Sequence, residues 1–332
     1  MVLETLYDIL RSEKHPLTLT IMAFIVTTVA MLLAYNSFAE ATSVSTLLFI
    51  TLGFMPIIHR IFISEEEKDI DEKDVPFAFI ATHFDVVRAY GWIFVGMVIA
   101  FSFWAVVLPD SSEKCSGTIG CMLPTKGLVF SEQKKVHFAI TGKITDGFAA
   151  TGNFIGEGQC FGAGKSFERC FMLIFKNNFG VMARAIVFSF LWGAGAIELL
   201  AWNASVIGFF IGSEITEKSF SAGLSRAIGY LPHGMPEVMA YFIAAIAGGI
   251  IHAAISKKVF RHFELRTVLI DVALLCLLAT ITLFIAALIE TAAIFNYWDI
   301  SIAGVAAFFV LFFVLYIPSV RYRIDKIRES NQ

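Results

Sequence analysis

The residues most able to do chemistry in this chain gather in the run Pro232-His233-Gly234-Met235-Pro236-Glu237. His233 and Glu237 are four residues apart, and with His252 they supply three side chains of the kind that bind zinc. The metalloprotease pattern His-Glu-x-x-His is absent, and no general base stands where that pattern requires one. We therefore predict no metal and no cofactor, and an intramembrane metalloprotease is the least favoured alternative.

The elements that must position this run are membrane helices. Of the 332 residues, 57% are hydrophobic and 16% are charged, whereas soluble domains carry about 25% charged residues. Apolar runs approach the roughly 20 residues that span a hydrocarbon core, and only a helix bonds every amide there. The sequence predicts an all-α, polytopic transmembrane helix bundle of seven or eight segments. These are Pro16–Tyr35, Val44–Ile63, Tyr90–Leu108, Val181–Trp202, a short Ala204–Ile215 that crosses or re-enters, Met235–Ile255, Val268–Ile289 and Ile300–Ile317.

Positive charge in the short loops predicts the orientation of the chain. Four lysines and arginines lie within residues 256–266 and four more within 318–332, so both stretches are expected in the cytoplasm, together with the N-terminus. The predicted segments and their orientation together divide the chain into four regions. They are a helix pair with an acidic hinge (1–76), a third helix (77–108), an outer segment rich in cysteine and glycine (109–165), and a helix bundle that ends with two C-terminal helices (166–332).

The predicted outer segment has its own pattern. Residues 135–141 alternate between polar and apolar side chains, which predicts a β-strand. Two cysteine pairs lie close in sequence, Cys115 with Cys121 and Cys160 with Cys170. An oxidising outer compartment allows two disulfides, although unpaired thiols remain an equal alternative because connectivity cannot be derived from sequence.

Small and amide side chains mark the central helices. Glycines that let helix backbones approach each other are expected at Gly193, Gly195, Gly208, Gly212, Gly248 and Gly249. Asn177 and Asn178 precede a predicted helix, which one of them caps. Asn203, His233 and Glu237 form either a functional polar centre or a purely architectural network.

Taken in order, these features resemble the stage II sporulation protein M family. The resemblance covers residues 171–255 and rests on the Asn-Asn pair, Gly193-Ala194-Gly195, Asn203, the Pro-His-Gly-Met-Pro-Glu run and Gly248-Gly249. It implies a multi-pass membrane protein, and binding roles for Asn177, Asn178, Asn203, His233 and Glu237. The sporulation member is a membrane component of an engulfment machine that works with cell-wall-degrading partners.

The function expected from these patterns is non-catalytic. We predict a cell-membrane scaffold that contacts lipid, holds a protein partner in the envelope and forms a homo-oligomer through its glycine faces. The acidic run at 64–74 is either a site for a basic partner or a solvated linker. A transporter or channel that uses His233 and Glu237 is the alternative. With a net charge of −3 and no basic tract, nucleic acid is not an expected partner.

Overall fold

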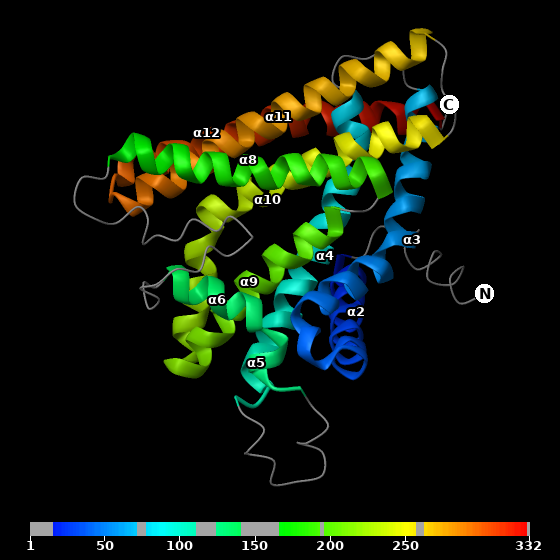
Figure 1. The fold of residues 1–332 in the computed structure, drawn as a ribbon. Helices are drawn as coiled ribbons and strands as arrows, with labels where there is room; N and C mark the ends of the chain where they lie inside the picture. Colours follow the sequence, from blue (N-terminus) through cyan, green and yellow to red (C-terminus); the bar gives the residue numbers. More distant parts are fainter. Residues whose placement is uncertain are drawn as a thin grey trace. The chain divides into compact units, whose positions relative to one another are not determined.

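Long helices account for most of the residues that the computed structural model describes, which are 16–71, 78–110, 124–140, 166–192, 196–256 and 262–330 (Figure 1). No strand occurs among these residues, so the predicted all-α class is confirmed. The elements are α2 (Pro16–Ser37), the 3-10 helix η1 (Ala39–Ala41), α3 (Thr42–Asp71), α4 (Ala78–Val107), α5 (Lys126–Val129), α6 (Ser131–Ile140), α8 (Phe167–Trp192), α9 (Ala196–Glu217), α10 (Phe220–Ser256), α11 (His262–Ile294) and α12 (Trp298–Ser330).

Seven helical stretches within the described part of the chain are long and apolar enough to cross a bilayer. They are Pro16–Ser37, Ala39–Ile58, Val87–Val107, Phe167–Trp192, Ala196–Glu217, Phe220–Ile255 and Val268–Ile294. A shorter apolar stretch, Trp298–Val314, begins α12. The predicted polytopic membrane fold is therefore confirmed.

The helices belong to two compact units. Unit 1 consists of Met1–Met55, Gly91–Ser166 and Ile197–Leu231, and unit 2 of Pro56–Tyr90, Phe167–Ala196 and Pro232–Gln332. The chain passes between the units inside α3, α4 and α10, and again at the beginnings of α8 and α9. The four regions predicted from the sequence stay a prediction, because they divide the chain by loops rather than by packing.

In unit 1, α4 packs directly against α2 and α9. Gly96 on α4 meets the backbone oxygen of Thr20 so closely that a Cβ could not be accommodated. Gly208 and Gly212 on α9 meet α4 in the same way, and a Cβ at position 208 would lie 2.6 Å from the Cβ of Phe101. Small residues thus let these helix backbones touch. Because lipid is as apolar as the helix side chains, such close van der Waals packing helps to hold membrane helices together.

The strand predicted in the outer segment is wrong, since residues 131–140 form helix α6. Gln133 and Val136 of α6 are buried, as is Phe130 just before the helix begins, so buried side chains recur every three residues. Phe130 lies between the rings of Phe101 and Phe209, at centroid distances of 6.1 and 5.2 Å. Over only a few residues, an alternation of polar and apolar side chains does not distinguish a strand from a helix with one buried face.

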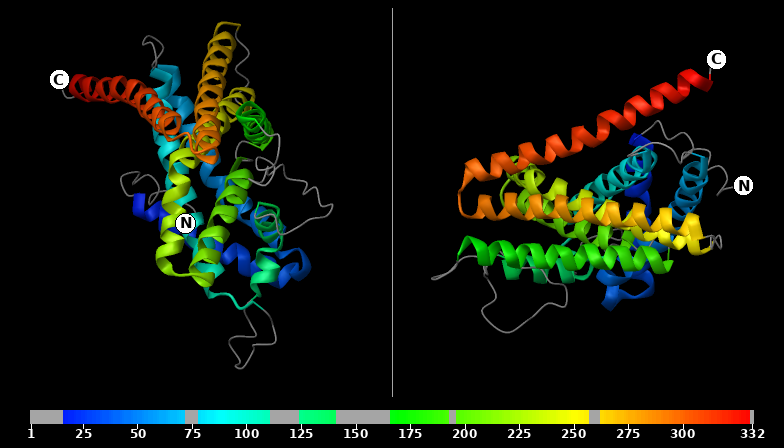
Figure 2. Two further views of the ribbon diagram at one scale, coloured as in Figure 1. Left: turned by 90° about the vertical axis from the view of Figure 1, so that its left-hand side faces the viewer. Right: turned by 90° about the horizontal axis from the view of Figure 1, so that it is seen from above.

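In unit 2, α11 packs against both α8 and α12 (Figure 2). The Phe284 ring of α11 meets Phe171 and Phe175 of α8 at 5.0 and 6.0 Å. On its other side, Ile289 lies against Gly304 of α12. The unit is therefore layered, with α11 as the middle helix of these three.

Two predicted boundaries are wrong. The fourth and fifth segments were expected to meet between Trp202 and Ala204, but α8 ends at Trp192 and α9 runs without a break from Ala196 to Glu217. The fifth segment is therefore a full-length helix, not a short one. Helix α3 also continues to Asp71, so most of the predicted acidic hinge is helical.

Candidate functional site

The site is built on Glu237, which lies inside α10. Its carboxylate Oε1 accepts a hydrogen bond of 2.7 Å from the hydroxyl of Tyr241, one helical turn further on. The predicted start of this segment at Met235 is wrong, because α10 runs from Phe220 through both Pro232 and Pro236. Each proline removes one N–H from the helix, but unbonded backbone is so costly in a membrane that the remaining residues stay helical.

Charged groups on two other helices act electrostatically on this pair. Glu290 of α11 and His233 both act electrostatically on the Glu237 carboxyl. Glu290 and Arg184 of α8 act on the Tyr241 hydroxyl. We call Arg184, His233, Glu237, Tyr241 and Glu290 the polar centre. All five belong to unit 2, and such groups in membrane helices normally face the bundle interior and mark functional sites.

The contacts between α8 and α10 fix which residues of the two helices lie at the same height along their axes. Gly248 lies against Ile186, and the His252 Nδ1 atom is 2.9 Å from the carbonyl oxygen of Phe190. Residue numbers increase in the same direction on both helices, so α8 and α10 run parallel. The same register places the α10 turn from Glu237 to Tyr241 roughly level with residues 175–180 of α8, given about 1.5 Å of rise per residue.

Asn177 and Asn178 lie at this level. Both are in the interior of α8, which begins ten residues earlier at Phe167, so the predicted helix cap is wrong. Asn178 is only 6% exposed, and its Oδ1 accepts a 3.0 Å hydrogen bond from Asn177 Nδ2. The Asn177 Oδ1 atom is buried without a hydrogen-bond partner. The capping signal misled because an Asn-Asn pair before an apolar run fits a helix start equally well.

Asn203 belongs to unit 1, whereas the other predicted binding residues belong to unit 2. It is 8% exposed on α9, and its Nδ2 donates a 2.8 Å hydrogen bond to the carbonyl of Leu199. Its role alongside His233 and Glu237 stays a prediction.

Of the six predicted packing glycines, three make close contacts with a neighbouring helix, one is buried, and two are not described. Gly208 and Gly212 meet α4, whereas Gly248 meets the backbone oxygen of Ile186 and the side chain of Ser189 on α8. Gly249 is buried on α10. Gly193 and Gly195 lie outside the described residues.

The predicted zinc ligands do not come together. Along a continuous helix His252 is about 28 Å from His233 and about 22 Å from Glu237, at 1.5 Å per residue. Within the part of the chain that the structure describes, no group of three or more histidine, cysteine or acidic residues is placed to hold a metal.

The four cysteines of the two predicted disulfides are only partly described. Cys170 is buried near the start of α8, while Cys115, Cys121 and Cys160 lie outside the described residues, so the disulfides stay a prediction. Cys276, a free thiol on α11, is half-buried.

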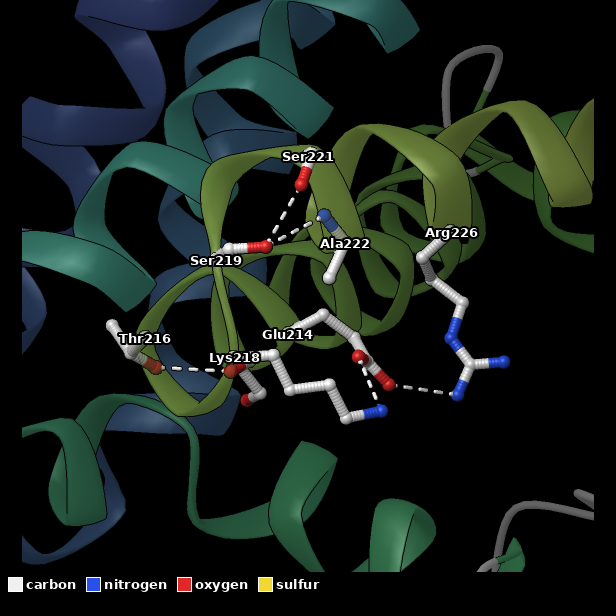
Figure 3. A network of polar contacts seen from close by, with 8 residues as sticks. Glu214, Thr216, Lys218, Ser219, Ser221, Ala222 and Arg226 are labelled. Atoms are coloured by element: carbon white, nitrogen blue, oxygen red, sulfur yellow. Dashed lines mark hydrogen bonds and ion pairs between the residues drawn. The ribbon is translucent and has the colours of Figure 1, made fainter.

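A further polar network, at the turn between α9 and α10, was not predicted (Figure 3). Glu214 pairs with Lys218 at 2.8 Å and with Arg226 at 3.1 Å, so one carboxylate joins both helices. The backbone N–H of Ala222 donates to Ser219 Oγ at 3.2 Å, which makes Ser219 the cap of α10. The i, i+4 spacing of Glu214 and Lys218 was a signal in the sequence.

We expect Glu214→Gln to loosen this turn and to cost about 1 kcal/mol or less, since both cationic partners are exposed. Thermal unfolding in detergent at low and high salt checks this. The variant should unfold earlier than wild type at low salt, and the difference should shrink at high salt because salt screens exposed pairs. The control is Glu217→Gln, an exposed neighbour on the same helix. Equal effects of the two variants would contradict the assigned role of Glu214.

The fold and the polar centre together define a class, the multi-pass α-helical membrane proteins. Within that class the chain belongs to the Stage II sporulation protein M family, which matches residues 91–293, more than half of its length. The resemblance inferred from residues 171–255 is therefore confirmed, and it extends well beyond them in both directions. Neither a curated protein nor a solved structure matched the chain.

Proposed function

We propose that the protein is a non-catalytic scaffold that holds a partner protein in the membrane of the cell envelope. The supporting observation is that several polar side chains of its membrane helices are hydrogen-bonded within their own unit. Tyr241 donates to Glu237, and Asn203 donates to the carbonyl of Leu199. Arg184 Nε donates to the carbonyl of Gly180 at 3.1 Å. A static bundle needs such bonds, because unpaired polar groups are costly in hydrocarbon.

The close glycine contacts support the same role. Gly208 and Gly212 bring α9 onto α4, and Gly248 brings α10 onto α8, with backbone atoms as neighbours. Contacts of this kind leave little room for one helix to slide along its neighbour, as expected of a rigid scaffold. They also occupy the faces of Gly208, Gly212 and Gly248 within the chain, so a homo-oligomer would have to use surfaces other than these three glycines.

The acidic end of α3 is the partner surface that we favour. Residues 64–71 carry five acidic residues against one lysine, and they continue the membrane helix without a break. A helix with this charge suits a basic partner, which long-range attraction would steer toward it.

Chemical cross-linking of native membranes, followed by capture of the chain, tests the scaffold proposal. Wild type should capture one reproducible partner, and Glu65→Gln/Glu66→Gln/Glu67→Gln should lose most of it. The matched control neutralises three exposed carboxylates elsewhere, with Glu168→Gln/Glu198→Gln/Glu217→Gln. Capture of no reproducible partner by wild type would overturn the proposal, and equal loss in both variants would overturn the choice of surface.

A transporter is the second candidate, and one observation favours it. The polar centre contains ionisable side chains from three membrane helices, α8, α10 and α11, and such groups often mark the pathway of a substrate or ion. This alternative requires that water reaches Glu237. Solute flux into liposomes, lost on Glu237→Gln, would support it over the scaffold.

The proposed orientation places both termini in the cytoplasm and residues 109–165 outside, where an oxidising compartment would favour disulfides. It predicts that Ser219 and Ser256, at opposite ends of α10, lie on opposite sides of the membrane. In intact cells, an impermeant maleimide should label Ser219→Cys above the wild-type background, and Ser256→Cys only after permeabilisation. Labelling of both from the same side would contradict this topology.

A further inference from the structure

Helix α8 carries a lysine on the side that faces away from its neighbours. The buried side chains of this helix include Ile174, Asn178 and Met182, which follow one another at intervals of four residues. Lys176 lies two residues from both Ile174 and Asn178, on the opposite side of the helix, and its side chain is exposed. It forms no hydrogen bond and no ion pair with any residue that the structure describes.

The other exposed side chains on this side of α8 are apolar. Met172, Phe179, Val187 and Phe190 are all exposed. They lie four residues before Lys176 and three, eleven and fourteen residues after it, spacings that share one face of a helix. The face from Met172 to Phe190 therefore suits lipid or another membrane helix, except for the charge of the lysine.

Ring contacts with α11 give the depth of Lys176 in the membrane. The preceding residue, Phe175, meets the ring of Phe284 at a centroid distance of 6.0 Å. Phe284 is three residues from the middle of the apolar stretch Val268–Ile294. The first residue of α8 meets Phe295, just beyond the end of that stretch, at 5.7 Å. Lys176 therefore lies near the middle of the membrane, not at its surface.

A lysine at this depth is unfavourable against lipid. Charged side chains in membrane helices are costly there, and they normally face the bundle interior and pair. Lysines near helix ends extend to the membrane surface, but Lys176 is nine residues from the start of α8, about 13 Å along the helix. Lipid headgroups lie at the surface and supply no negative charge at this depth. A carboxylate from another membrane helix would neutralise the lysine.

We propose that the exposed face of α8, from Met172 to Phe190, binds a transmembrane helix of the partner protein, and that an aspartate or glutamate of that helix pairs with Lys176. The inference rests on the proposed partner-holding role, and it adds a contact within the membrane to the one at the acidic end of α3. The apolar side chains of Met172 and Phe179 would surround the pair and keep water from it, which strengthens the attraction between the two charges.

Photo-cross-linking in native membranes tests this with the full-length chain. A benzoylphenylalanine probe replaces Phe179, beside Lys176, or Phe313, an exposed phenylalanine on α12 that serves as the control. We expect the probe at position 179 to cross-link one protein. Mass spectrometry should map the cross-link to a membrane segment of that protein that contains an aspartate or glutamate. The control probe should cross-link this segment weakly or not at all.

Variants of Lys176 distinguish charge pairing from packing alone. In the chain with the probe at position 179, Lys176→Gln should lower the yield of the cross-link by about tenfold or more. Lys176→Arg keeps the charge and should keep most of the yield. Lys176→Glu should lose the cross-link, and replacing the mapped carboxylate of the partner by lysine should restore it. Thermal unfolding in detergent shows whether each variant is folded.

The inference is overturned if the probe at position 179 cross-links no protein, a segment without a carboxylate, or this chain itself. It is also overturned if folded Lys176→Gln gives the wild-type yield. Capture through the acidic end of α3 distinguishes these results from failure of the proposed function. A partner captured there leaves the scaffold role in place, whereas the absence of any reproducible partner overturns both.

Discussion

Replacing Gly248 by alanine is expected to destabilise the folded protein by about 2 kcal/mol or more. A Cβ at this position would meet the backbone oxygen of Ile186 and lie 2.9 Å from the Cβ of Ser189. Backbone cannot move aside as a flexible side chain can, and overpacking of this kind typically costs 1–3 kcal/mol. Thermal or denaturant unfolding in detergent micelles measures the loss.

The matched control for this prediction is Gly180→Ala on α8, the helix that Gly248 touches. Nothing lies within 4 Å of the Cβ that this change adds. Alanine is the better helix former by roughly 0.5–1 kcal/mol, so the control should be neutral or more stable than wild type. If Gly248→Ala is as stable as this control, α8 and α10 are not in backbone contact, and the register that positions Asn177 is wrong.

The second large effect is expected at Gln133, a 2% exposed side chain on α6. Its Oε1 accepts from Ser43 Oγ of α3 at 2.9 Å, and its Nε2 donates to Ser205 Oγ of α9 at 2.8 Å. Gln133→Leu removes both bonds and leaves two buried hydroxyls with fewer partners. We expect a loss of about 2–4 kcal/mol, since each buried group left unsatisfied costs about 1–3 kcal/mol.

A triple-mutant cycle checks this assignment. The triple variant with Ser43→Ala and Ser205→Ala removes all three polar groups, and it should recover part of the stability that Gln133→Leu loses. Ser225→Ala, at an exposed position on α10, is the control and should have little effect. If the costs of the three substitutions simply add, Gln133 does not link α3, α6 and α9.

The presence of the long helices could be predicted from the sequence, because few other backbone structures can span a membrane. Apolar runs such as Pro16–Ser37 and Val268–Ile294 are too long for anything but helices in hydrocarbon. The family could also be inferred, because the order of its motifs between Phe171 and Ile255 is visible in the sequence and does not depend on how the helices pack.

Helix ends could not be predicted in the same way. Pro236 fits the first turn of a helix, yet α10 begins at Phe220 and passes through it. Asn177 fits a cap, yet it lies in the interior of α8. In both cases a local preference worth about 1 kcal/mol gives way to the larger cost of leaving backbone groups unbonded in the membrane.

The composition of the polar centre was only partly predictable. His233 and Glu237 were identified from their spacing, but Tyr241 was overlooked although it is four residues from Glu237 and therefore on the same helix face. Arg184 and Glu290 come from other helices, so only their packing against α10 brings them to it. Sequence spacing can relate residues within a helix, whereas partners between helices depend on register.

The mass of the complex that gentle extraction releases from native membranes tests the central claim most directly. Native mass spectrometry should find the 36.7 kDa chain bound to one different protein, and the variant with Glu65, Glu66 and Glu67 changed to glutamine should be found without it. A chain that appears only at its own mass, or at whole multiples of it, would contradict the partner-holding role.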